Sequence, residues 1–230
     1  MTRPAWDDVV LMSAPRVTGV PVDEREDDPA PLVDATGFHP RLGVDDREDD
    51  GSGARPHRHL RRPVLERLAD AADALPGDLR LVLVEGWRRP SLQRTIFERY
   101  RDELGAADPA RTAEELHHLA ARHISPPEVA PHPAGTAVDV LLTTPEGIEL
   151  DVACPINATP EESGGRCYTD HPDVGGEARL LRVELGRALA GAGFVNYPTE
   201  WWHWSYGDRY WARATGAPHA RYGTVLDLPE

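Results

Sequence analysis

The chain has 230 residues, enough for one domain of ordinary size that buries most of its apolar surface without extra cross-links. Its formal net charge of −14 argues against nucleic acid and membrane surfaces as partners, because phosphate backbones and anionic lipids are bound by basic patches. All 25 basic residues are arginine, which excludes Schiff-base chemistry and a lysine general base.

The first 19 residues have acidic residues where a signal peptide needs an uninterrupted apolar stretch, and the sequence has no apolar run long enough to span a bilayer. We therefore expect a cytoplasmic protein. Residues 22–59 are dominated by Asp, Glu, Pro and Gly, a composition typical of long loops. The predicted organisation is an irregular, acidic N-terminal segment (1–59) packed on a catalytic domain (60–230), forming a single domain overall.

Regular structure is predicted from about residue 60 onward. Amphipathic spacing or capping signals predict helices at 63–75, 91–104, 112–123 and 176–193. Short β-branched runs predict strands at 79–86, 136–142 and 147–152, and a strand pair within 194–206. Hairpin-length connections between the later strands favour an α+β fold, with a central antiparallel sheet and helices packed beside it.

Two cysteines, Cys154 and Cys167, bracket a 12-residue loop. A disulfide between them is geometrically possible, but a cytoplasmic setting keeps thiols reduced. A metal site made of these two cysteines and His171 lacks closely spaced ligand pairs. We interpret both cysteines as structural.

The segment HPAGTAVD places His132 on a loop that enters a strand and Asp139 inside that strand. A carboxylate buried alone costs several kcal/mol or takes up a proton, so Asp139 needs a cationic partner, either a metal ion or an arginine. The remaining histidines, such as His117 and His118 on a predicted helix, are expected to be solvated.

A second segment, PTEWWHWSY, crowds three of the six tryptophans around Glu200 and His203. The aromatic residues alone are compatible with an ordinary core. If the chain bends before the strand, however, His203 completes a set of three zinc ligands with His132 and Asp139. Glu200 then lies beside the fourth position as an acid that does not bind the metal.

This combination suits amide hydrolysis, since zinc lowers the pKa of a bound water and polarises the scissile carbonyl while Glu200 moves the proton. An oxyanion stabiliser is also needed. Arg88 and Arg89, at the end of a predicted strand, are candidates for it, although either is equally compatible with an ordinary surface arginine.

Three stretches, EGWRRPSLQ, SPPEVAPHPAGTAVDV and GFVNYPTEWWHWSYGDRYW, together resemble the zinc D-alanyl-D-alanine dipeptidases of the vancomycin-resistance type, in peptidase family M15. The similarity covers about residues 60–214. It implies that His132, Asp139 and His203 bind one Zn2+ per chain. It also implies that Glu200 is the general base and acid for a zinc-activated water, and that Arg88 stabilises the reaction intermediate.

The sequence departs from the family pattern near the expected substrate site. Trp87 replaces the tyrosine of the G-Y-R motif, and Ala130 replaces a serine near the first zinc ligand. Asn157 stands where the family has an aspartate that pairs with the ammonium group of the dipeptide. We predict that Asn157, Trp87 and Trp202 contact the substrate.

The leading hypothesis is hydrolysis of a D,D-dipeptide such as D-Ala-D-Ala, with a small peptide as substrate and no prediction of the oligomeric state. Two alternatives stay open. The same zinc scaffold could act on a capped, longer or non-alanyl amide, because Asn157 lacks the negative charge. It could also be a non-catalytic, metal-dependent module that binds peptides.

Overall fold

The computed structural model describes residues 9–23, 30–49, 51 and 53–228. The helical elements of this part of the chain are α1 (Pro15–Thr18), η2 (Pro56–Arg58), α2 (Arg62–Ala74), α3 (Pro90–Ala107), α4 (Ala113–Ala120), η3 (His132–Ala134), α5 (Pro160–Ser163), α6 (Gly176–Gly191) and α7 (Arg209–Thr215). The strands are β1 (Leu32–Asp34), β2 (Leu42–Val44), β3 (His59–Arg61), β4 (Arg80–Glu85), β5 (Ala137–Thr143), β6 (Val195–Asn196) and β7 (His203–Ser205).

The central sheet has five strands in the order β2-β4-β5-β7-β6, and β1 and β3 form a separate two-stranded sheet. Every pair in the central sheet is antiparallel except β2 and β4, which are parallel. The α+β fold is therefore confirmed, and the expectation of an antiparallel sheet fails only at this edge. All seven residues of β5 are buried, because the strand lies in the middle of the sheet with neighbours on both sides.

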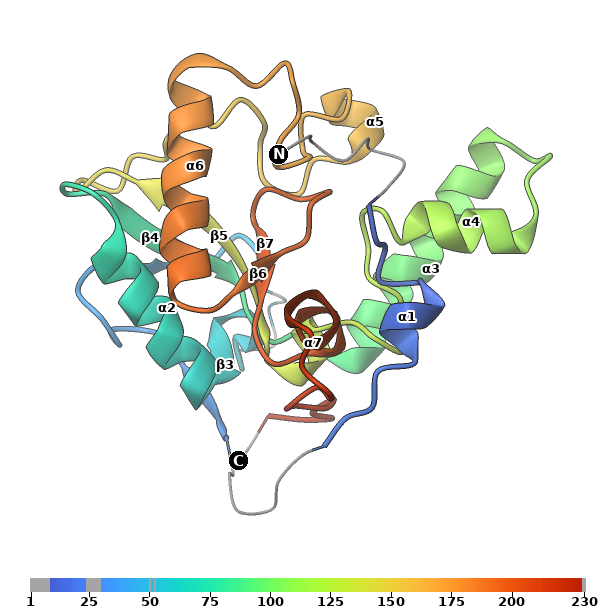
Figure 1. The fold of residues 1–230 in the computed structure, drawn as a ribbon, viewed down its shortest axis with the longest axis horizontal. Coiled ribbons are helices and arrows are strands. Elements are labelled where there is room, and N and C mark those ends of the chain that lie inside the picture. Colours follow the sequence, from blue (N-terminus) through green and yellow to red (C-terminus); the bar gives the residue numbers. More distant parts are fainter. Residues whose placement is uncertain (1–8, 24–29, 50, 52, 229–230) are drawn as a thin grey trace.

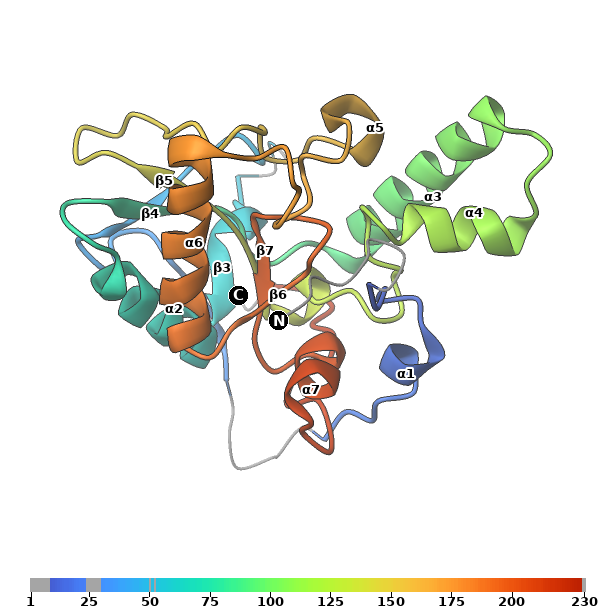
Figure 2. The same cartoon turned by 45° about the horizontal axis from the view of Figure 1, so that its top comes forward.

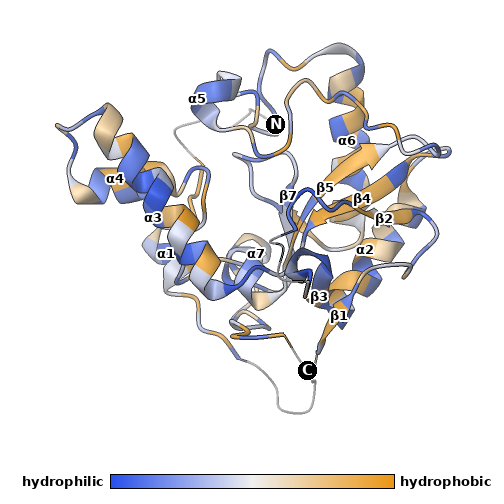
Figure 3. Cartoon of the chain, turned by 180° about the vertical axis from the view of Figure 1, so that it is seen from behind, coloured by the Kyte–Doolittle hydropathy of each residue, from blue (hydrophilic) through white to orange (hydrophobic). Residues whose placement is uncertain are grey.

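Helices α2 and α6 lie side by side against the sheet (Figures 1 and 2). In α2 the apolar residues Val64, Leu65 and Leu68 are fully buried, as their helical spacing predicts. Helices α3 and α4 form a hairpin that extends away from the sheet on the opposite side of the molecule. Viewed from behind, β4 and β5 are among the most hydrophobic strands of the sheet (Figure 3).

The described part of the N-terminal region is mostly turns and irregular chain, as predicted, but it also contains short strands that the sequence did not indicate. Leu32 is buried in β1 and Leu42 in β2, and β2 becomes an edge of the central sheet. Each strand has three residues and only one well-buried apolar side chain, too few to produce a recognisable period. The strand predicted at 147–152 is also reduced, to a single bridge between Thr143 and Glu149.

Cys154 and Cys167 are both free and buried in the main hydrophobic core, which agrees with a structural role. Burial raises the pKa of the Cys167 thiol to about 11. Across the described ranges, the helices are all too short or too polar to cross a membrane.

Candidate metal centre and active site

His132 is presented by the 3₁₀ turn η3, just before β5. The turn ends at Gly135, whose φ of 70° lies in the left-handed region that glycine adopts without strain. The Nδ1 atom of His132 lies 2.7 Å from the carbonyl oxygen of Gly86 and donates to it, because a carbonyl can only accept. The proton is thereby fixed on Nδ1, and Nε2 is left with a lone pair for a metal ion.

Asp139 and His203 are direct partners in the antiparallel pair of β5 and β7. His203 Nδ1 lies 2.9 Å from Asp139 Oδ1, and His132 Nε2 lies 3.3 Å from Asp139 Oδ2. Burial alone would raise the pKa of Asp139, but His132 and His203 outweigh it and hold that pKa well below its usual range. The carboxylate is therefore kept ionised between two imidazoles.

Glu200 comes from the loop that joins β6 to β7. The backbone turns there through hydrogen bonds from Glu200 N–H to the Tyr197 carbonyl (2.9 Å) and from His203 N–H to the Glu200 carbonyl (3.3 Å). These hydrogen bonds form the bend before β7 that is needed to bring Glu200 and His203 to the same site. Glu200 Oε2 lies 3.8 Å from His203 Nδ1, so the acid is beside the cluster.

The donor set fits zinc. One ligand atom from each of His132, Asp139 and His203 lies within 4.8 Å of the other two, and all three residues are buried. Two imidazole nitrogens and one carboxylate oxygen are ligands that Zn2+ takes, and three protein ligands leave a fourth position for water or substrate. The Nε2 atom of His203 is buried and has no hydrogen-bond partner among the described residues.

His123 is a site residue that the sequence analysis missed. Its Nδ1 atom lies 3.0 Å from Glu200 Oε1, and the ring packs edge-on against Trp202. The expectation that the remaining histidines are solvated is wrong for His123 and for His57, whose side chains are 9% and 1% exposed. Position on a helix end gave no sign of this burial, because α4 ends at Ala120 and the chain then turns inward.

Arg88 is held in place by two side chains. Its Nε atom donates to Glu85 Oε1 at 2.6 Å, a second nitrogen donates to Glu85 Oε2, and a third donates to Gln93 Oε1 at 2.9 Å. Burial would lower the pKa of Arg88, but the charge of Glu85 outweighs this and raises it. Two of the five guanidinium N–H donors are left for another ligand.

These groups share one cavity of about 300 Å³. The predicted site residues in its wall are Arg88, His132, Asp139, Asn157, Glu200, Trp202 and His203. The residues not anticipated there are Glu48, Glu85, Ile96, Arg99, His123, Ile124 and Ser125.

Trp87 does not belong to this wall, contrary to its predicted contact with substrate. Its side chain is fully buried, and the indole N–H donates to the Pro133 carbonyl at 3.1 Å. Trp87 thus anchors the turn that carries His132. Arg89, the other candidate arginine, is also outside the cavity wall and lies over the Trp87 ring at 5.9 Å.

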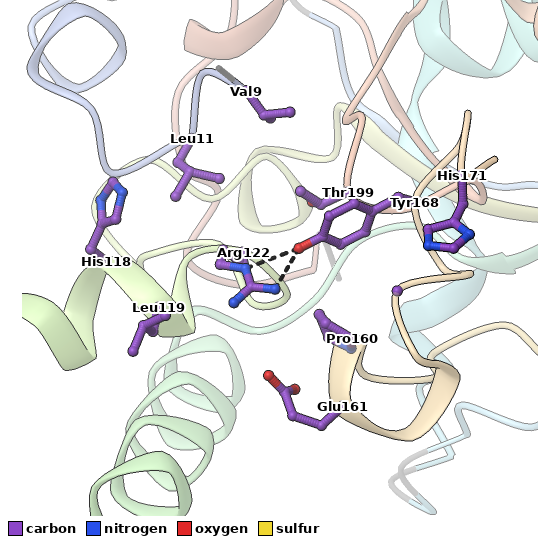
Figure 4. Close-up of a pocket in the computed structure, with 11 residues that line it drawn as sticks. Val9, Leu11, His118, Leu119, Arg122, Pro160, Glu161, Tyr168, His171 and Thr199 are labelled. Carbon is purple, nitrogen blue, oxygen red and sulfur yellow. Dashed lines mark hydrogen bonds between the residues drawn. The ribbon is translucent and has the colours of Figure 1, made fainter. Parts of the chain in front are cut away.

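A larger cavity, of about 530 Å³, lies elsewhere (Figure 4). The hydroxyl of Tyr168 accepts hydrogen bonds from Arg122 at its wall. None of the three metal-ligand candidates lines it, and no other cluster of metal-ligating side chains is found in the part of the chain that the structure describes. The candidate metal ligands therefore line the smaller cavity.

The fold and this cavity are those of a single-metal hydrolase, with three candidate ligands, an adjacent carboxylate and a fixed arginine. Comparison with known proteins gives the family: residues 66–219 match the Peptidase_M15 model, D-ala-D-ala dipeptidase, and the chain belongs to this family of metallopeptidases. The resemblance read from the three sequence stretches is therefore confirmed.

Two relatives are called D-alanyl-D-alanine dipeptidase. The protein from Synechocystis is 27% identical over 205 residues, which is 76% of this chain and 82% of the relative. The protein from Escherichia coli is 28% identical over 134 residues, 58% of this chain and 63% of the relative.

Solved structures match more loosely. The LdcB LD-carboxypeptidase has a TM-score of 0.39 at 16% identity, covering 82% of this chain and 75% of that one. VanYB in complex with D-alanine-D-alanine has a TM-score of 0.32 at 16% identity, covering 69% and 78%. At these TM-scores and identities, the solved structures give no information about the site of this chain.

Proposed function

We propose that this chain hydrolyses the amide bond of a D,D-dipeptide such as D-Ala-D-Ala, using one bound zinc ion. The observation that carries the proposal is the buried cluster of His132, Asp139 and His203, with Glu200 beside it in one small cavity. Membership of the family and the names of the two relatives support the substrate class.

His132, Asp139 and His203 would hold the zinc, which when bound supplies Lewis acidity that polarises the scissile carbonyl and acidifies water. Glu200 accepts a proton from the attacking water as the new carbon–oxygen bond forms. It then delivers that proton to the amine nitrogen as the carbon–nitrogen bond breaks. His123, in contact with the other oxygen of Glu200, fixes the orientation of the carboxylate.

Arg88 stabilises the negative charge that develops on the amide oxygen, using the donors that Glu85 and Gln93 leave free. Because its guanidinium is already ion-paired and hydrogen-bonded, it needs little reorganisation during the reaction. A cavity of about 300 Å³ lies at the small end of the ligand-site range, which suits a dipeptide better than a long peptide.

One observation favours a second candidate. Asn157 lines the cavity in the place of the expected aspartate, so an amide with a capped or otherwise uncharged amino end is the alternative substrate. A purely non-catalytic binding module is disfavoured by the presence of Glu200 and Arg88 beside the ligand cluster. A cytoplasmic location remains a prediction from the sequence.

The test is release of free D-alanine from D-Ala-D-Ala by the zinc-loaded protein. Glu200→Ala should retain zinc, since Glu200 is not a ligand, and lose about 10²–10⁴-fold in kcat. Glu184→Gln, which removes a half-buried carboxylate on α6 that lies outside the cavity wall, is the matched control and should keep full activity. Absence of turnover in a wild-type protein that holds one zinc contradicts the proposal.

A further inference from the structure

Among the described residues, one carboxylate in the active-site cavity contacts neither an arginine nor a histidine. Four carboxylates line it: Glu48, Glu85, Asp139 and Glu200. Glu85 is ion-paired with Arg88, Asp139 lies between two imidazoles, and Glu200 lies against His123. Within the described ranges, the hydrogen-bond partner of Glu48 is the neutral amide of Asn157, at 2.9 Å.

The backbone just before Glu48 is anchored through two residues, Arg47 and Asp46. Arg47 pairs with Glu149 at 2.8 Å, which ties the loop after β2 to the segment following β5. Asp46 accepts hydrogen bonds from Arg58. The loop is thus held from two sides while the Glu48 side chain lies in the cavity wall.

The surroundings of Glu48 favour a positive ligand. Burial raises the pKa of its carboxyl group, and the charges of Glu85 and Asp139 raise it further, against the opposing effect of Arg88. A glutamate loses its charge at neutral pH only if its pKa rises by about three units. A negative charge in such a place is best relieved by a cation from outside the protein.

We infer that Glu48 and Asn157 together form the subsite for the free ammonium group of the substrate. This inference rests on the proposed function and identifies which end of the dipeptide this wall of the cavity binds. Asn157 donates through Nδ2 to Glu48 Oε1, so Glu48 Oε2 and Asn157 Oδ1 are available as acceptors. An ammonium group has three donors and no acceptor, and it matches this pair.

The pair also explains how the cavity keeps a charge that Asn157 lacks. Glu48 lies 109 positions away along the chain, outside the family match at 66–219, yet it reaches the side chain of Asn157. Asn157 has a φ of 64°, a conformation that asparagine tolerates better than most residues. The amide thus shapes the subsite while Glu48 supplies the negative charge.

The test is equilibrium binding to zinc-loaded protein that carries Glu200→Ala, so that nothing is hydrolysed. Two ligands are compared by calorimetry: D-Ala-D-Ala, with a free ammonium group, and N-acetyl-D-Ala-D-Ala, without one. Three further variants are made in this background: Glu48→Gln, Glu48→Gln with Asn157→Asp, and Glu149→Gln. The last loosens the same loop from outside the cavity and is the control for indirect effects.

We expect Glu48→Gln to weaken binding of the free dipeptide by about ten-fold and to change binding of the acetylated one by less than about two-fold. Adding Asn157→Asp should restore most of the loss by returning the charge to the neighbouring side chain. Glu149→Gln should leave both affinities unchanged.

The inference is overturned if Glu48→Gln weakens both ligands equally or neither, if Asn157→Asp gives no rescue, or if neither dipeptide binds. Its failure is distinct from that of the proposed function, which is judged by D-alanine release from the wild-type protein. Selective binding without turnover would leave the subsite standing and remove the hydrolytic proposal. Turnover with no effect of Glu48→Gln on the binding selectivity would do the reverse.

Discussion

Replacing Glu85 by glutamine should destabilise the protein strongly, because it leaves the Arg88 guanidinium buried without its ion-pair partner. The two side chains are 8% and 13% exposed, so water can replace little of the lost interaction. Glutamine keeps the shape of glutamate and one acceptor oxygen, so the change removes charge rather than volume. Glu85 lies directly opposite Asp139 in the sheet, and Arg88 lines the same cavity as Asp139. A movement of Arg88 would therefore change the shape of this cavity.

The expected magnitude follows from the burial. Removing one partner of a buried ion pair costs about 3–5 kcal/mol. Here Gln93 still accepts from Arg88, and Asp139 and Glu48 act on it electrostatically, so we expect the lower end, about 3 kcal/mol. For a chain of this length each kcal/mol shifts Tm by about 2–4 °C, which gives a fall of roughly 6–12 °C.

The assay is thermal and urea unfolding of metal-free protein, so that zinc binding does not contribute to the measured stability. Glu85→Gln, Arg88→Gln and the double variant form a cycle. The double variant should lose less free energy of unfolding than the sum of the two single variants, because it leaves no unpaired charge. A decrease in Tm of less than about 2 °C for Glu85→Gln, together with additive changes in the free energy of unfolding across the cycle, would refute the reasoning that Glu85 holds Arg88.

Three further outcomes are expected. Chelating zinc should lower the Tm of the wild-type protein but leave the Tm of His203→Ala unchanged, because this variant should contain no zinc when its metal content is measured. Zinc bound stoichiometrically to His203→Ala would contradict the ligand set. Hydrogen bonds from Arg58 and then His57 lower the pKa of Asp46 to about 2. The folded protein therefore favours the charged form of Asp46 more than the unfolded chain does. The resulting stabilisation is complete above the unfolded-state pKa near 3.9 and is lost as pH falls toward 2. The stability difference between wild type and Asp46→Asn in urea should therefore be constant above about pH 5 and shrink between pH 4 and pH 2, and a difference that grows with acidity would show the opposite sign. Finally, a thiol reagent at pH 8 should find Cys154 and Cys167 unreactive in the native protein and both reactive after unfolding, whereas fast modification of Cys167 would contradict its burial and its pKa of about 11.

The helices and the central strands could be predicted because their residues show a period that burial imposes. Helix α2 has a continuous apolar face, and β5 is an uninterrupted buried run. The short strands β1 and β2 could not be predicted, since their pairing depends on β3 and β4, which are distant in the sequence. A three-residue strand is specified by its partner rather than by its own side chains.

The site divides in the same way. The candidate zinc ligands and Glu200 are recognisable because the strand register and the hairpin turn are local features that bring fixed spacings together. Glu48 and His123 are not recognisable, because their partners Asn157 and Glu200 are distant in the sequence. Glu85 has its partner Arg88 only three residues away, but the sequence does not show that this pair is buried in the cavity wall. Trp87 shows the converse: its position beside Arg88 suggested a substrate contact, but the side chain packs behind the loop and holds His132 instead.

Trp201, in the aromatic cluster around Glu200, connects the turn that contains Glu200 to the distant segment between Cys154 and Cys167. The backbone N–H of Trp201 donates to the Cys167 carbonyl at 2.9 Å, and its indole N–H donates to the Cys154 carbonyl at 3.1 Å. The loop that contains Asn157 is thereby fixed to the turn that presents Glu200. Because these bonds use backbone carbonyls, they do not depend on which side chain occupies position 157. An aspartate-to-asparagine change there can alter what the amino end of a substrate contacts while the Glu200 carboxylate stays in place.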